Sequence, residues 1–323
     1  MFNNKKILIT GGTGSFGQFF VSKILKKYKK IKRLVIFSRD ELKQYEMQKN
    51  YDEKKYPFLK FFIGDVRDVD RLKTAFKDID YVFHTAALKQ VPAAEYNPFE
   101  FVKTNILGTQ NVVDASLAND VKKVIFLSTD KACSPLNLYG ATKLAAEKII
   151  IAANNIKGKK KISFSVVRYG NVMGSRGSVI PAFINAKKEN KPFLITDYTM
   201  TRFNLTLDQA TNYVINFLKI AKGNEIFIPK LPTIFVKDIA KAIDSKNKTK
   251  KIGIRVGEKL FEELISQSEI ANCEEKKNYF IIYPDKSFLK KKSKKIYKGY
   301  NSKDNRNILN VKDIKDLIKN SIN

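Results

Sequence analysis

The sequence predicts an α/β fold with a doubly wound parallel sheet and a smaller C-terminal region. Three observations lead to this prediction. Short apolar runs alternate with stretches of helical spacing, the first apolar run leads directly into a glycine-rich turn, and the regular alternation fades after residue 172. Alternating strands and helices are typical of parallel sheets covered by helices. We therefore divide the chain at residue 172, with residues near 205–245 expected to pack back on the first domain.

The composition is that of a globular protein with an unusual excess of positive charge. The 323 residues are 43% hydrophobic and 11% aromatic, and the formal net charge is +29. Most of this charge is lysine spread over the chain, with one dense run at 289–298. Such a run can bind polyanions but is more often a solvated surface, and no nucleic-acid-binding motif accompanies it. We expect no nucleic-acid partner, and the order of residues 286–300 stays open.

From the N-terminal residues we expect neither a signal peptide nor a membrane span. The apolar run Ile7–Ile9 is too short for a signal peptide or a membrane span, so we expect a soluble, cytoplasmic protein with no membrane partner. The two cysteines have no metal-type spacing and suggest a reducing compartment. The single histidine, His84, excludes a multi-histidine metal site; it lies in a strand pattern, and we expect it to be structural.

A nucleotide phosphate site is predicted at the N-terminus. The first strand, 5–10, runs into Gly11-Gly-Thr-Gly14-Ser-Phe-Gly17, and a helical pattern follows. Glycines permit the tight turn and the close approach of the backbone to a pyrophosphate, and the helix N-terminus supplies free N–H groups. The alternative, a plain turn, fits this strand–turn–helix context less well. The candidate cofactor residues here are Gly11, Thr13, Gly14, Ser15, Phe16 and Gly17.

The second strand, 33–37, ends in residues that favour NADP over NAD. An NAD site usually carries an acidic residue at this point, which binds the ribose 2′-hydroxyl. This chain has Ser38, Arg39 and Asp40, with Lys43 one helical turn further on. Arg39 and Lys43 suit a 2′-phosphate through charge-assisted hydrogen bonds. Asp40 could still reach a hydroxyl, which leaves NAD as the alternative.

The next strands add further cofactor candidates. The strand 59–63 is followed by Asp65 and Val66, and Asp65 is placed to accept a hydrogen bond from an adenine amino group or to cap the next helix. The strand 81–83 ends near Ala86, whose small side chain allows a cofactor to approach the sheet edge. A helix is expected at 99–117, and it contains Thr104. Val172, after the strand 163–167, completes the cofactor set.

The stretch from Ser128 to Lys143 carries the predicted chemistry. A buried strand at 124–127 leads into a loop, and Tyr139 opens a helix that extends to 153. Tyr139 and Lys143 are four residues apart and share one helix face, so the ammonium is expected to lower the tyrosine pKa. Tyr139 is thus a candidate base for a hydroxyl group. The alternative is a Tyr-Lys pair on a solvated helix, which the neighbouring polar cluster Thr129-Asp130-Lys131 disfavours.

The C-terminal half, 173–323, is predicted to be mainly substrate-binding. It contains a glycine-rich loop at 174–181, helices at 207–220 and 236–243 and a strand at 225–228. Its scattered arginines suit a diphosphate as a set, although each alone is more often a surface charge. The candidate substrate residues are Lys89, Asn171, Arg176, Ser178, Val179, Thr196, Arg202, Arg255 and Glu258.

These motifs together resemble the extended short-chain dehydrogenase/reductases, and most closely the inverting UDP-N-acetylglucosamine 4,6-dehydratases that begin pseudaminic acid synthesis. The triplet Thr129-Asp130-Lys131 distinguishes this family, since retaining 4,6-dehydratases usually have Thr-Asp-Glu and epimerases Ser-rich triplets. The chain departs from the family pattern at several positions, none of them a proposed catalytic group: Gln90, Ser134-Pro135, Val256, Asn204 and Phe261. The matching stretches are Thr10–Gly17, Phe37–Gln44, Phe62–Asp68, Ala93–Pro98, Ser128–Ala132, Asn137–Lys143, Arg168–Val172, Gly174–Pro181 and Gly253–Arg255.

The resemblance implies a lyase reaction on a UDP-sugar with tightly recycled NADP. Tyr139, activated by Lys143 and assisted by Thr129, would take the proton of the 4-hydroxyl during oxidation at C4. Lys131, with a pKa lowered by burial, would remove the C5 proton, and Asp130 would protonate the departing 6-hydroxyl. The product would be UDP-2-acetamido-2,6-dideoxy-L-arabino-hex-4-ulose. Relatives form homo-oligomers, including hexamers, so we expect a homo-oligomer here.

Three other functions stay open at this point. A retaining nucleotide-sugar 4,6-dehydratase and a UDP-sugar C4 epimerase use the same scaffold, and the product distinguishes them: an epimerase forms no C6 methyl, and the configuration at C5 separates the dehydratases. A non-catalytic NADP-sensing or polyanion-binding protein belongs to a different class. The presence of Tyr139, Lys143, Asp130 and Lys131 argues against that class.

Overall fold

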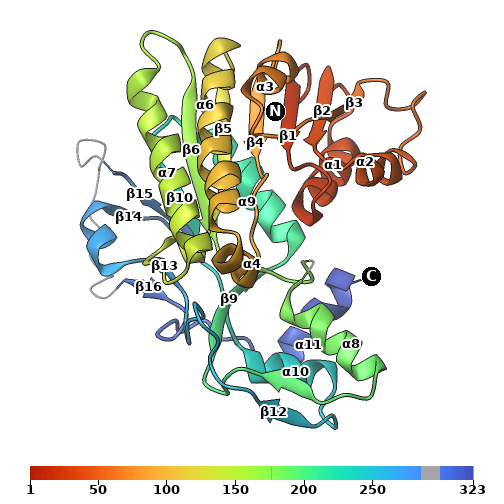
Figure 1. Ribbon diagram of the computed structural model, residues 1–323, viewed down its shortest axis with the longest axis vertical. Coiled ribbons are helices and arrows are strands. Elements are labelled where there is room, and N and C mark those ends of the chain that lie inside the picture. Colours follow the sequence, from red (N-terminus) through yellow and green to blue (C-terminus); the bar gives the residue numbers. More distant parts are fainter. Residues whose placement is uncertain (176, 285–298, 323) are drawn as a thin grey trace.

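The computed structural model describes residues 1–175, 177–284 and 299–322. Arg176 and most of the basic segment 286–300 lie outside the described residues. The fold class is confirmed as α/β, with one large, mostly parallel sheet and smaller sheets from the C-terminal part of the chain (Figure 1).

The large sheet has the strand order of a dinucleotide-binding fold. Six parallel strands run in the order β3-β2-β1-β4-β5-β6, so the order reverses between β1 and β4, where ligands bind in open α/β sheets. Beyond β6, the sheet continues with a parallel β10 and an antiparallel β15 and β14. The nine strands are β1 (Lys6–Thr10), β2 (Arg33–Ser38), β3 (Leu59–Ile63), β4 (Tyr81–His84), β5 (Lys123–Thr129), β6 (Ser163–Tyr169), β10 (Ile226–Pro229), β15 (Tyr279–Ile282) and β14 (Cys273–Glu275).

Helices cover both faces of this sheet, which explains why its central strands are apolar runs without alternation. All seven residues of β6 are buried. Helices α3, α6 and α7 pack side by side, and α1 contacts α9 (Figure 1). The helices of this part are α1 (Ser15–Lys27), α2 (Glu41–Gln48), α3 (Val69–Ala75), α4 (Val91–Tyr96), α5 (Pro98–Phe101), α6 (Gly108–Ala118), α7 (Leu138–Ile156) and α9 (Leu207–Ile220), with the short turns η1 (Val102–Leu107) and η2 (Asp130–Ala132).

A second, smaller core forms below the sheet in Figure 1, built from α8, α10, α11 and the strands near them. The division at residue 172 into two domains stays a prediction. The helices of this region are α8 (Val179–Lys188), α10 (Val236–Ile243) and α11 (Val311–Ile322), with the short turn η3 (Gln267–Asn272). Its strands form three small sheets: β7 (Asn171–Val172), β9 (Thr201–Leu205) and β11 (Thr233–Phe235); β8 (Phe193–Ile195) with β12 (Thr249–Lys251); and β13 (Glu263–Ile265) with β16 (Tyr300–Asn301).

The predicted strands and helices are present with small differences at their ends, and one helix differs in kind. The helix expected at 99–117 consists of α5, the π-helical turn η1 and α6. Such turns are rare and often lie at functional sites. Within η1, the side chain of Asn105 accepts from the backbone N–H of Leu88 and donates to the Leu88 carbonyl, both at 2.9 Å. The turn therefore fixes the loop that follows β4.

Candidate active site

A cavity of about 630 Å³ opens at the carboxyl ends of the parallel strands. Its lining joins the glycine-rich turn after β1, the ends of β2, β4 and β5, the first turn of α7 and the segment around β7. The structure thus brings together most of the predicted cofactor residues, although binding by them stays a prediction. Those that line the cavity are Gly11, Thr13, Gly14, Ser15, Phe16, Gly17, Ser38, Arg39, Asp40, Lys43, Val66, Ala86, Thr104, Tyr139, Lys143 and Val172.

The glycine-rich turn has the shape that a phosphate site requires. Gly11 has a φ of +68°, and a Cβ at this position would lie 2.8 Å from the backbone of Ala86. A Cβ on Gly17 would lie 2.4 Å from the carbonyl oxygen of Gly12, so α1 can begin this close to β1 only with glycine there. Gly14 caps α1 without a side-chain hydrogen bond. The first N–H groups of α1 are therefore available for an anion.

Arg39 and Lys43 lie at the end of β2, but both have carboxylate neighbours. Asp40 caps α2 by accepting from the backbone N–H of Lys43 at 3.0 Å, and it also pairs with the Lys43 ammonium. Asp65 lies 3.6 Å from Arg39 and accepts two side-chain hydrogen bonds from Arg67. Burial opposes ionisation of Asp65, but the Arg67 hydrogen bonds outweigh it and lower the Asp65 pKa. The adenine contact predicted for Asp65 stays a prediction.

Several polar side-chain atoms lining the cavity are buried and have no protein partner among the described residues. They are the hydroxyls of Thr104, Ser128 and Ser178 and the amide oxygen of Asn171. Buried polar atoms are normally hydrogen-bonded, so unpartnered ones along a cavity indicate a polar ligand. This lining fits a dinucleotide and a sugar nucleotide, which present many hydroxyl and phosphate groups.

Tyr139 contacts Thr129 at the end of β5, but the tyrosine pKa is not lowered. Burial raises the pKa of Tyr139 to about 12, while the Lys131 ammonium and a hydrogen bond with Thr129 act in the opposite direction. The expectation that Lys143 lowers this pKa towards neutrality is therefore wrong for the structure. The cation that favours the phenolate is Lys131.

Lys143 is instead held inside the sheet–helix interface. Its Nζ donates to the carbonyl of Leu127 at 2.8 Å and lies 3.9 Å from the ring centroid of Phe126. Burial lowers the pKa of Lys143 to about 7, and Glu147 opposes the shift only in part. A lysine with this pKa changes its charge near neutral pH.

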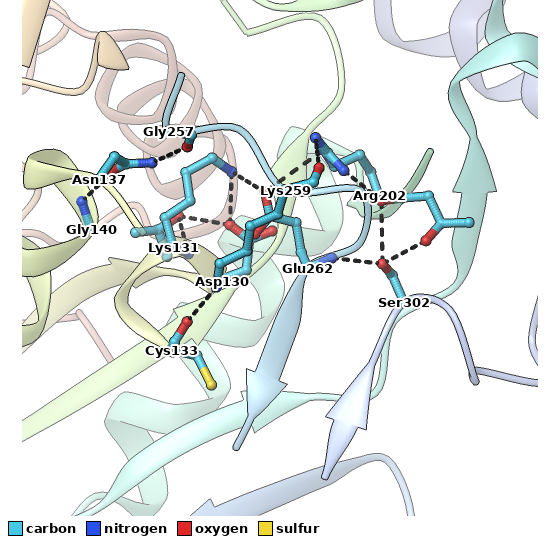
Figure 2. A network of polar contacts seen from close by, with 12 residues as sticks. Asp130, Lys131, Cys133, Asn137, Gly140, Arg202, Gly257, Lys259, Glu262 and Ser302 are labelled. Atoms are coloured by element: carbon cyan, nitrogen blue, oxygen red, sulfur yellow. Dashed lines mark hydrogen bonds and ion pairs between the residues drawn. The ribbon is translucent and has the colours of Figure 1, made fainter. Parts of the chain in front are cut away.

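Lys131 lies between two buried carboxylates (Figure 2). Its Nζ is 3.0 Å from Oδ1 of Asp130 and 3.3 Å from Oε1 of Glu262. Burial lowers the pKa of Lys131, but the charges of Asp130 and Glu262 outweigh burial and raise it above its ordinary value. The expectation of a lowered Lys131 pKa is thus wrong, because it left out the second carboxylate. Burial raises the pKa of Asp130, as its predicted role as an acid requires.

The predicted substrate residues fall into separate groups. Lys89, Asn171 and Ser178 line the cavity. Val179 packs against the second core. Thr196 donates to Oε2 of Glu258 at 3.3 Å, and Arg255 Nε lies 4.0 Å from the same oxygen.

Arg202 has a structural connection that its sequence context did not indicate. Its guanidinium donates to the carbonyls of Thr201, Lys259 and Leu260, and its Nε lies 3.7 Å from Oε1 of Glu262 (Figure 2). Through its hydrogen bonds to Lys259 and Leu260, Arg202 therefore holds the segment around residue 260 close to Lys131. Sugar-nucleotide binding by all nine candidates stays a prediction.

Sequence reasoning missed Glu262 altogether. Glu262 directly precedes β13, which begins at Glu263. Two consecutive acidic residues in a sequence are usually solvent-exposed, so this pair gave no signal. The Glu262 side chain is nevertheless only 3% exposed and contacts a residue far along the chain. Only the tertiary fold reveals this contact.

His84 is structural, as predicted. It is fully buried, and its ring nitrogens contact the hydroxyls of Thr10 at 2.7 Å and Thr109 at 3.1 Å. Burial and the charge of Lys143 lower its pKa to about 3. The described ranges contain no cluster of three or more His, Cys, Asp or Glu residues that could hold a metal. Among the helices of these ranges, none combines the length and the apolar character that crossing a membrane requires.

The strand order, the phosphate loop and the Tyr-x-x-x-Lys helix define an extended short-chain dehydrogenase/reductase. Residues 7–284 match the family described as polysaccharide biosynthesis protein, and the chain belongs to this family.

Three similar proteins give this membership more detail. An inverting UDP-N-acetylglucosamine 4,6-dehydratase of Campylobacter jejuni serotype O:2 is 52% identical over 292 residues, which cover 90% of this chain and 86% of the relative. A UDP-glucose 4-epimerase of Rickettsia bellii is 44% identical, with 99% of this chain and 97% of the relative covered. The X-ray structure of Pen from Bacillus thuringiensis is 43% identical, with a TM-score of 0.90 and 99% of both chains covered.

Proposed function

We propose that this protein is an inverting UDP-N-acetylglucosamine 4,6-dehydratase, a lyase. The observation that carries the proposal is the position of Lys131 and Asp130 at the end of β5, beside Tyr139 and the dinucleotide-sized cavity. An acid, a strong nitrogen base and a hydroxyl-binding tyrosine are the groups that elimination of water from a sugar requires. The 52% identical relative carries the same name.

We propose NADP as the cofactor, held by the glycine-rich turn with Arg39 and Lys43 at the ribose end. Arg39 is 48% exposed and lines the cavity, so its guanidinium can meet a 2′-phosphate. A nicotinamide dinucleotide bound there would supply a hydride acceptor for C4 and a hydride donor for C6. Because the hydride returns, turnover consumes no external reductant.

The side chains of the protein handle the protons. Tyr139 takes the proton of the 4-hydroxyl, favoured by the charge of Lys131 and by its hydrogen bond with Thr129. Lys131, in its amine form, takes the proton from C5, which the 4-ketone has made acidic. Asp130 donates its proton to the 6-hydroxyl, the C6–O bond breaks, and water leaves. As C6 is reduced, a proton from solvent adds to C5 on the opposite face and inverts that centre, while the proton that Tyr139 took returns to solvent.

The internal contact between Lys131 and Asp130 prepares both groups for this step. The reaction needs an amine and a carboxylic acid, whereas an ion pair has the proton on Lys131. Transfer of one proton from Nζ to Oδ1 across 3.0 Å breaks one N–H bond, forms one O–H bond and gives both reactive forms. No proton has to be exchanged with solvent.

A UDP-sugar C4 epimerase is the second candidate, favoured by the 44% identical relative of that name. An epimerase needs the C4 hydride transfer and Tyr139 but no acid for a 6-hydroxyl. The pairing of Asp130 with Lys131 therefore favours dehydration. A homo-oligomer and a cytoplasmic location stay predictions.

Proton NMR of the purified protein with UDP-N-acetylglucosamine in heavy water tests the proposal. The expected spectrum has a new C6 methyl signal, deuterium at C5 and couplings of an inverted C5. A product with its 6-hydroxyl intact and an altered C4 would establish the epimerase instead. An unchanged spectrum, also after NADP is added, would contradict this substrate.

A further inference from the structure

Glu262 occupies a position that the proposed reaction does not yet use. Its carboxylate contacts Lys131 as Asp130 does, but it comes from a distant segment of the chain (Figure 2). The side chains of Asp130 and Glu262 are 1% and 3% exposed. Oδ2 of Asp130 and Oε2 of Glu262 are also buried without a hydrogen-bond partner in the described part of the chain. Burying a second carboxylate is costly, so a structural role alone explains it poorly.

The backbone holds Glu262 in place independently of Lys131. Its N–H donates to Oγ of Ser302 at 3.0 Å, and the N–H of Ser302 donates to the Glu262 carbonyl at 2.8 Å. Ser302 Oγ also contacts the hydroxyl of Thr201 at 2.9 Å. Arg202, next in β9, lies 3.7 Å from the carboxylate. Contacts with β9 and with Ser302, the residue after β16, therefore fix the position of the Glu262 carboxylate beside Lys131.

We propose that Glu262 is a positioning residue for the C5 proton transfer, holding Nζ of Lys131 beside Asp130 and stabilising the ammonium that forms when Lys131 takes up the proton. The inference rests on the proposed dehydration. In that step the C5–H bond breaks and an N–H bond forms, so positive charge develops on Nζ while Asp130 becomes a carboxylate. A fixed negative charge 3.3 Å from Nζ stabilises this product state, in the way that preorganised charges stabilise transition states.

The ionisation of the surrounding groups supports this role. Burial opposes the charge of Glu262, but Lys131, Arg202 and Lys259 together lower its pKa, so it stays a carboxylate. In turn, Glu262 contributes to the raised pKa of Lys131 and makes this lysine a stronger base. The charged and titratable groups that face Lys131 are Asp130, Tyr139, Glu262, Arg202 and Lys89.

The test compares Glu262→Gln with Glu262→Asp and with Glu263→Gln, which removes the adjacent carboxylate, on the first residue of β13. We expect Glu262→Gln to lower kcat for methyl formation by roughly tenfold to a hundredfold with KM unchanged. The acidic limb of its pH–kcat profile should move to lower pH, because the Lys131–Asp130 pair loses a negative charge that raises the pKa of both groups. Glu262→Asp should recover part of the loss, and Glu263→Gln should match the wild type. Thermal unfolding checks the fold of each variant.

Three results would overturn the role of Glu262: wild-type kcat in Glu262→Gln, a reduced kcat with an unmoved acidic limb, or an Asp variant no more active than the Gln variant. If Glu262→Gln does not fold, Glu262→Asp carries the test, since its shorter side chain weakens the pair with Lys131 and should move the limb in the same direction. A wrong proposed function would give a different result, because the wild-type protein itself would then form no C6 methyl group.

Discussion

Nζ of Lys131 lies 3.0 Å from Oδ1 of Asp130, the residue directly before it in the chain. The two residues begin the short turn η2, which directly follows β5 at the carboxyl end of that strand. Thr129 stabilises this arrangement by donating to the same oxygen of Asp130, also at 3.0 Å. The proposed acid and base are thus consecutive residues of one short turn, which limits how far they can move apart.

Replacing Lys131 with methionine should abolish the elimination but not the binding of nucleotide. Loss of the C5 base is expected to lower methyl formation by at least about a hundredfold, since proton-transfer groups typically contribute that much. Methyl formation and C5 deuteration by NMR measure the effect, and NADP titration checks binding. Lys148→Met, on the exposed face of α7, is the control. Near-normal turnover in Lys131→Met would exclude Lys131 as the base.

Replacing Tyr139 with phenylalanine should stop the reaction one step earlier. Without its hydroxyl, no group takes the proton from the 4-hydroxyl, so both C5 deuteration and methyl formation should fall by roughly a hundredfold or more. Transient absorbance of reduced nicotinamide after mixing with substrate should disappear too. Tyr96→Phe, at a side chain that is 89% exposed, should behave as the wild type. Retained C5 deuteration in Tyr139→Phe would contradict the assignment.

Replacing Arg39 with alanine should weaken NADP selectively. Loss of charge-assisted hydrogen bonds to the 2′-phosphate is expected to raise the NADP Kd about tenfold to a hundredfold while the NAD Kd stays nearly constant. Calorimetric titration with both nucleotides gives the ratio. Arg33→Ala, at the opposite end of β2, is the matched control because its guanidinium donates to the Lys77 carbonyl. Equal losses for both nucleotides would refute a 2′-phosphate contact.

The buried Lys143 should make stability depend on pH in a defined window. Its folded pKa of about 7 lies below the ordinary value of 10.5. Between these values the unfolded chain binds more protons than the folded protein, so the Lys143 contribution to the free energy of unfolding rises with pH there. Relative to Lys143→Met, the wild type should gain stability as the pH rises from about 7 to about 10. Urea unfolding across this range measures the difference, and a constant offset would show that the pKa is not lowered.

Breaking the buried ion pair between Arg168 and Glu147 at the sheet–helix interface should be strongly destabilising. Both side chains are buried, and Arg168 also lies 2.9 Å from Glu269. Glu147→Gln leaves part of the guanidinium charge uncompensated and should cost about 3–5 kcal/mol of unfolding free energy. Asp120→Asn, which removes an exposed pair with Lys160, should cost about 0–1 kcal/mol. Similar costs for the two variants in urea unfolding would contradict this expectation.

The sequence predicts the parallel strands and the cavity well for a physical reason. Strands such as Ile7–Ile9 and the helix of Tyr139 and Lys143 have strong local patterns, and the carboxyl ends of parallel strands converge by topology alone. Residues placed just after these ends therefore meet without any further information. The glycine spacing after β1 works in the same way, because steric contact with Gly12 and Ala86 demands it.

The electrostatics of the site could not be predicted in this way. The pKa of Lys131 depends on Glu262, which arrives from a distant segment, and that of Tyr139 depends on how completely α7 is buried. Neither burial nor a long-range contact leaves a local pattern. The π-helical turn η1 was also invisible, since it uses the same apolar spacing as an ordinary helix.

Strand β10 has a consequence for any shortened form of the chain. It covers the outer edge of β6, a fully buried strand, and is itself covered by β15. A fragment that stops after β6 would expose a row of unpaired backbone groups flanked by apolar side chains. Such an edge is a template for other chains, so the fragment should aggregate instead of folding as a separate nucleotide-binding unit.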